Sequence, residues 1–104
     1  MDAGQTPVAI DVFEKARKVQ GAAFTHDLDL GVLYLAARRI QEAKAALDRV
    51  PPTHPEYPMA LFKRAQVSVL LNEPDKAARI ALARQKADRT TKGLIARERL
   101  FAGR

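Results

Sequence analysis

Alanine recurs in this chain at one constant spacing, because Ala9, Ala43 and Ala77 are evenly separated. Their separation equals a repeat length of about 34 residues, which is typical of stacked helical hairpins. We call this separation the repeat period. One hairpin cannot bury its apolar face alone, so a neighbouring hairpin must cover it. We therefore expect a row of paired helices rather than a single globular core, with these three alanines at helix contacts inside the hairpins.

Proline, glycine and capping residues divide the chain into six expected helices. Thr6 and Pro7 form a helix start, and Gly21 forms a stop. The segment 51–55 holds three prolines and is the clearest break, after which Pro58 opens a fourth helix to about residue 71. The other helices are expected at about 25–38, 40–50 and 74–87, and from Thr90 or Thr91 to about 102. No strand-like alternation is present, so the expected fold class is all-α with antiparallel neighbours.

Composition excludes disulfides, thiolate metal sites and membrane-spanning segments. The chain has no cysteine, which excludes disulfides and thiolate metal sites. No segment approaches the roughly 18 apolar residues that span a bilayer, and the first residues do not resemble a signal peptide. We therefore expect a cytoplasmic protein that does not enter a membrane.

One pentapeptide carries a family resemblance. The residues Leu30-Gly31-Val32-Leu33-Tyr34 match the L-G-x-x-Y core of a tetratricopeptide repeat. The residues that follow at the family's spacings are Ala43, Leu47, Val50 and Pro55. The chain thus resembles the tetratricopeptide repeat family, which implies a right-handed superhelix of antiparallel helical hairpins. The resemblance also implies a non-enzymatic scaffold for protein–protein interaction.

The resemblance sets a register for the whole chain as one domain, 1–104. Ala9, Phe13 and Ala16 match the second half of a repeat. We expect a half-repeat helix at 7–21, full repeats at 24–57 and 58–91, and a capping helix at 92–102. The second full repeat departs from the family pattern where a leucine, an aromatic, a bulky apolar and a small residue are usual; these positions hold Arg64, Ser68, Ala81 and Arg84.

In this family the first helix of each repeat lines a concave groove. The resemblance places the following residues there: Leu28, Val32, Leu35 and Ala36 from one repeat, and Met59, Phe62, Lys63, Gln66 and Val69 from the next. Leu28 and Val32 stand where some members carry the lysine and asparagine of a carboxylate clamp, so that mode is disfavoured. An apolar groove favours an amphipathic or apolar peptide as ligand. For Leu28 and Leu35, burial between repeats is an equally open alternative.

Two other binding modes stay open. An unpaired half-repeat would expose an apolar face at Ile10, Phe13 and Phe24, which predicts a homodimer or a fragment of a longer array. The segment 76–104 carries nine Lys and Arg against two acidic residues, within a chain of formal net charge +6. Its candidate anion-binding residues are Arg79, Lys86, Arg97 and Arg99. Nucleic acid is disfavoured as the anion because this segment lacks aromatic residues for stacking on bases, apart from Phe101.

Catalysis has little support in the sequence. His26 and His54 are far apart and lie in or beside loops, where surface or capping roles are expected. No metalloprotease, phosphate-loop or serine-hydrolase motif is present. We expect no catalytic residues, no cofactor and no metal site.

Overall fold

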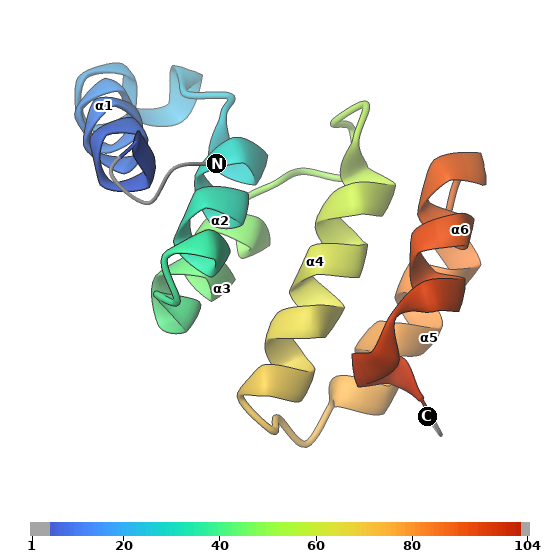
Figure 1. Cartoon of the computed structure of the whole chain (residues 1–104). Coiled ribbons are helices and arrows are strands. Elements are labelled where there is room, and N and C mark those ends of the chain that lie inside the picture. Colours follow the sequence, from blue (N-terminus) through green and yellow to red (C-terminus); the bar gives the residue numbers. More distant parts are fainter. Residues whose placement is uncertain (1–4, 103–104) are drawn as a thin grey trace. The chain divides into compact units, whose positions relative to one another are not determined.

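The computed structural model describes residues 5–102, and within them it contains six α-helices and no strand. The elements are α1 (Gln5–Gln20), η1 (Gly21–Ala23), α2 (Asp27–Ala36), α3 (Ile40–Asp48), α4 (Tyr57–Leu70), α5 (Lys76–Lys86), α6 (Arg89–Arg97) and η2 (Arg99–Phe101), where η denotes a 3₁₀ helix (Figure 1). The all-α prediction is confirmed. Gly21 ends α1 with a φ of +55°, as its position predicts.

The chain divides into two compact units, Met1–Val50 and Pro51–Arg104, which we call unit 1 and unit 2. The division falls at the proline-rich break. Unit 1 contains α1, α2 and α3, and unit 2 contains α4, α5, α6 and η2. The superhelical arrangement of one domain over 1–104 stays a prediction.

The hairpin of unit 1 closes on a contact between α2 and α3. A Cβ atom built on Gly31 would lie 2.7 Å from Cδ2 of Leu47, so any larger residue here would force the Leu47 side chain to shift. Ala43 and Ala46 on α3 are fully buried. Small residues allow the two helix axes to approach closely, and Leu47 then fills the remaining space. The predicted contact of Gly31 and Ala43 with the opposite helix of the hairpin is confirmed.

The inner face of α1 packs against α2 within unit 1. Ile10 and Phe24 are buried, and the rings of Phe13 and Phe24 meet edge to face with centroids 6.4 Å apart. The prediction that Ile10 and Phe24 form an exposed apolar face is therefore wrong. These residues cover their own hairpin, because burying them there removes their apolar area from water.

Tyr34 links α2 to α1 through its hydroxyl group, which donates a hydrogen bond to Oε2 of Glu14 at 2.9 Å. Burial is the largest cause of a rise in the Tyr34 pKa to about 12, and the hydrogen bond to Glu14 adds to it. Arg39 acts in the opposite direction, with its guanidinium carbon 4.8 Å from the centroid of the Tyr34 ring. The tyrosine of the L-G-x-x-Y pentapeptide thus links α2 to α1.

Unit 2 is built around one apolar cluster, which draws residues from each of its helices. The cluster contains Phe62, Ala65, Ile80, Ala83, Ile95 and Phe101. Ala77 lies outside it and is exposed, so the prediction that Ala77 marks a helix contact is wrong. Ile80 and Ala83 are buried instead; Ile80 follows the buried Ala46 by one repeat period, whereas Ala83 follows the exposed Arg49 by one repeat period.

Apolar area accounts for the difference between α3 and α5. Ile80, one repeat period after the buried Ala46, is buried, whereas the smaller Ala77 and Ala81 are exposed. Burying an isoleucine side chain contributes about 1.5 to 3 kcal/mol more than leaving it exposed.

Two departures from the family pattern form a buried polar group in unit 2. Arg64 Nη1 donates to Ser68 Oγ and to Glu73 Oε1, both at 2.8 Å, and Ser68 Oγ donates to Glu73 Oε1 at 2.7 Å. Arg64 and Ser68 are buried one repeat period after Leu30 and Tyr34, which are buried in unit 1. The ion pair joins α4 to the α4–α5 loop, so this part of unit 2 is held by charge and hydrogen bonds.

The C-terminal part differs from the predicted single helix at 92–102. Asp88, rather than Thr90 or Thr91, caps α6, since its Oδ1 accepts a hydrogen bond from the Thr91 amide at 2.8 Å. Hydrogen bonding to Thr91 also lowers the pKa of the Asp88 carboxyl. The helix ends at Arg97, and η2 turns Phe101 into the core, where its ring meets Phe62 edge to face at 5.8 Å. Burial of Phe101 favours this break over a continuous helix.

The α2–α3 contact predicts the effect of one added methyl group. Gly31→Ala should lower the free energy of unfolding, because overpacking costs about 1 to 3 kcal/mol and exceeds the helix-propensity gain of about 1 kcal/mol. Gly93→Ala is the matched control, since its Cβ would meet only Arg97 Nη2 at 3.6 Å. Urea denaturation followed by circular dichroism should show Gly93→Ala unchanged or stabilised. A Gly31→Ala protein as stable as the parent would contradict the close contact.

The Tyr34 pKa predicts a loss of stability at alkaline pH. Since the folded chain holds the phenol proton more tightly than the unfolded chain, this contribution is complete below pH 10 and is lost as the pH rises through about 12. Absorbance of the phenolate in a Tyr57→Phe background isolates the Tyr34 signal. Glu14→Gln should lower the Tyr34 pKa while leaving it above 10, because burial remains. Titration of Tyr34 near its ordinary value in both proteins would overturn this account.

Candidate protein-binding surfaces

The predicted groove residues of α2 differ in their accessibility. Leu28 is only 5% exposed, so it belongs to the core rather than to a ligand surface. Leu35 is half-buried, whereas Val32 is 37% exposed and Ala36 is exposed. On this helix the predicted groove side chains that a partner can reach are therefore Val32 and Ala36.

The predicted groove residues of α4 are partly covered by the chain's own C-terminal segment. Phe62 is 3% exposed and is a core residue of unit 2, which corrects its placement on an open surface. Met59 and Val69 are half-buried against the same cluster. Gln66 Nε2 donates to Glu98 Oε2 at 2.5 Å, and Lys63 Nζ lies 5.5 Å from the centroid of the Phe62 ring.

Equivalent positions of the two helices nevertheless remain accessible. Val32 and Ala36 on α2 correspond, one repeat period later, to Gln66 and Leu70 on α4. Leu70 is 45% exposed and was missed in the sequence, although its place one repeat period after Ala36 was a signal that could have identified it. We call Val32 and Ala36 the α2 strip, and Lys63, Gln66 and Leu70 the α4 strip. Each strip combines apolar area with polar neighbours.

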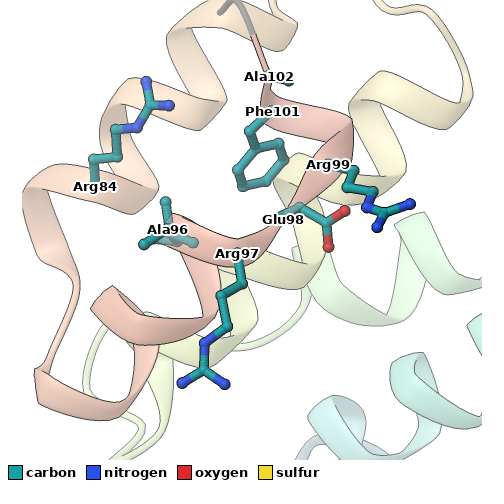
Figure 2. A pocket seen from close by; sticks show the side chains of 8 residues that line it. Arg84, Ala96, Arg97, Glu98, Arg99, Phe101 and Ala102 are labelled. Atoms are coloured by element: carbon teal, nitrogen blue, oxygen red, sulfur yellow. The ribbon is translucent and has the colours of Figure 1, made fainter.

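The predicted anion-binding residues do not form one site. Arg97 and Arg99 line a depression of about 520 Å³ in unit 2 together with Arg84, which the sequence did not indicate for this role. Glu98 also lines it, and the guanidinium groups of the three arginines point away from one another (Figure 2). Arg79 and Lys86 are not among the lining residues, and Arg79 forms an ion pair with Asp75 at 2.9 Å.

Unit 1 has a second depression, of about 450 Å³, between α1 and α2. Its lining is mostly charged and contains Asp11, Glu14, Lys15, Arg17, Lys18, Leu30 and Tyr34. The acidic and basic groups are interspersed, and Lys15 pairs with Asp11 at 3.0 Å. This depression therefore shows no preference for one sign of charge.

The two histidines occupy the surface positions expected for them. His26 precedes α2, lies 3.2 Å from the Asp29 carboxylate and contacts the Phe13 and Phe24 rings. His54 Nδ1 accepts a hydrogen bond from the Glu56 amide at 3.0 Å. Between residues 5 and 102, no three or more His, Cys, Asp or Glu side chains gather as metal ligands would. Over the same residues, no helix is long and apolar enough to cross a membrane.

Comparison with known proteins places these features in a family. Neither the curated proteins nor the solved structures contain a match. The sequence profile described as tetratricopeptide repeat matches residues 1–65, which include α1 and the whole α2–α3 hairpin. With more than half of its length matched and the L-G-x-x-Y residues at the hairpin contact, this chain belongs to the tetratricopeptide repeat family.

Proposed function

We propose that this chain is a protein-binding scaffold whose α2 strip, in unit 1, and α4 strip, in unit 2, are each a surface for an apolar or amphipathic peptide of a partner protein. Repeats of this family generally mediate protein–protein interaction, and the family is a non-enzymatic kind of domain. The observation that carries the proposal is that the same face of two equivalent helices leaves an apolar side chain accessible, Val32 on α2 and Leu70 on α4. The cytoplasmic location remains part of the proposal.

The chemistry of the strips selects the ligand class. Val32 and Leu70 offer apolar area, while Asp29 and Lys63, which occupy equivalent positions of α2 and α4, offer one charge of each sign. A peptide with apolar residues on one side and mixed charges beside them satisfies both kinds of group. The clamp positions hold Leu28, which is buried, and Val32, so a terminal carboxylate is not the expected anchor.

The proposal predicts the result of selecting a phage-displayed random-peptide library on the immobilised full chain. Enriched peptides should be amphipathic, and Val32→Asp with Leu70→Asp should weaken their binding by about tenfold or more. The reason is that a polar group buried without a partner costs about 1 to 3 kcal/mol, and a charged carboxylate costs more. Fluorescence anisotropy of labelled peptides measures the change.

A control with the same added charge separates the strips from a general electrostatic effect. Gln41→Asp with Gln85→Asp places two carboxylates on exposed positions of α3 and α5. This control should bind the selected peptides as the parent does. Equal loss of binding in both double variants, or enrichment of no peptide at all, would refute the proposal.

The second candidate function is binding of a polyanion by the basic residues of unit 2. Its supporting observation is the depression that brings Arg84, Arg97 and Arg99 together. Two features weaken it relative to the first candidate, namely the Glu98 carboxylate in the lining and the diverging guanidinium groups (Figure 2).

Under this second candidate, heparin or a labelled oligonucleotide should bind at low salt and dissociate steeply as salt is added. Arg97→Glu with Arg99→Glu should abolish that binding, whereas Arg79→Glu, outside the depression, should reduce it only slightly. No detectable binding at low salt, or binding that is insensitive to salt, would dismiss the polyanion.

A further inference from the structure

The outer face of α1 carries a line of exposed valines. Val8, Val12 and Val19 are 63%, 58% and 87% exposed. Lys15 completes the line, because successive steps of about three or four residues keep side chains on one side of a helix. The opposite side of α1 holds the buried Ile10. We call these four exposed residues the valine stripe.

Helix propensity does not explain why valine occupies these exposed positions of α1. Valine is a poorer helix former than alanine because its branched side chain loses rotamer freedom in a helix. A valine on a helix surface therefore contributes to stability mainly when another surface covers it. Three such residues in one line indicate a surface that is covered in the functional state of the protein.

Comparison with α3, one repeat period later, indicates that the valine stripe is a helix-packing surface. Val12 corresponds to Ala46, which is fully buried on α3, and Ala9 corresponds to Ala43, which is also fully buried. The helix that carries these two buried positions, α3, packs against α2. On α1 the same helix positions are open or half-open in the described chain, so α1 retains a face of the type that packs against another helix.

The geometry points to a second copy of this chain as the occupant, with the two α1 helices packed antiparallel along their valine stripes. A two-fold axis beside residues 13 and 14 would place Val8 opposite Val19 of the second copy. Lys15 within the stripe and Asp11 beside it are both exposed. In the antiparallel arrangement Asp11 lies within about one residue rise of Lys15 of the second copy, whereas a parallel arrangement would oppose like charges.

The border of the stripe also suits this packing. Ala9 and Ala16 lie beside Val12 and are small, which allows two helix axes to approach to about 8–10 Å. A surface whose charges are complementary to those of its own copy favours a homodimer over an unrelated partner. The inference concerns α1 alone and is independent of the α2 and α4 strips.

Sedimentation equilibrium of the full chain tests the dimer. The parent should dimerise, and Val12→Asp should raise the dissociation constant by at least tenfold. Asp11→Lys should weaken the dimer, and Asp11→Lys combined with Lys15→Asp should restore it, since the exchanged charges still pair across the axis. Circular dichroism should show parental helicity in every variant, because all three positions are exposed.

Cysteine cross-linking tests the antiparallel geometry, because the chain contains no cysteine of its own. A mixture of Val8→Cys and Val19→Cys chains should form a disulfide between the two kinds of chain. Neither variant alone should cross-link, since an antiparallel pairing separates like positions by about 16 Å along the helix.

Each contrary outcome overturns the inference. A parent that stays monomeric at every concentration excludes the dimer, and an unchanged dissociation constant in Val12→Asp excludes the valine stripe. Cross-linking of Val19→Cys with itself would show a parallel pairing. Failure of the peptide-binding proposal leaves these results unaffected, because Val12→Asp should bind the selected peptides as the parent does.

Discussion

The close contact between Gly31 and Leu47 is the constraint on which unit 1 depends. The contact leaves no room for a Cβ atom at residue 31, so the helix axes of α2 and α3 approach as nearly as side chains permit. Ala43 and Ala46 then lie fully buried between the helices, and Tyr34 reaches Glu14 on α1. Because one close approach sets the positions of the other side chains, the small residue at 31 determines which faces of α2 are buried and which remain accessible.

Unit 2 buries polar residues at positions where unit 1 buries Leu30 and Tyr34. At the positions that follow Leu30 and Tyr34 by one repeat period, it buries Arg64 and Ser68, and Glu73 accepts hydrogen bonds from Arg64 Nη1 and Ser68 Oγ. Buried ion pairs contribute less to stability than well-packed apolar residues, but they restrict the arrangements in which the charges are satisfied. The apolar cluster around Phe62 and Phe101 supplies the burial that these polar positions do not.

The sequence predicted the parts of this structure that depend on residue type at a fixed spacing. The all-α fold, the Gly31 contact and the stop at Gly21 follow from small residues and from a left-handed φ, which the pattern specifies locally. The exposure of Ala77 on α5 and the break before Phe101 do not follow, because each is decided by competition for burial among side chains that only the folded unit brings together. Accessibility of Phe62 fails for the same reason, because neighbours distant in sequence, Ile80 and Phe101 among them, bury it.

Function in a repeat of this kind resides in the positions that the packing leaves uncovered. Residues that lie one repeat period apart occupy matching positions of their helices, so their exposures can be compared directly. When one is buried and the other is exposed, a neighbouring segment covers the first and not the second. Ala36 and Leu70 are both accessible and so suit a ligand surface common to the two first helices, whereas Val12 and Ala46 differ sharply in exposure. The first comparison is expected of a scaffold that presents the same face in each repeat. The difference between Val12 and Ala46 is expected if a second copy of the chain covers α1. An apolar, β-branched residue such as Val12 adds to stability only when another surface covers it.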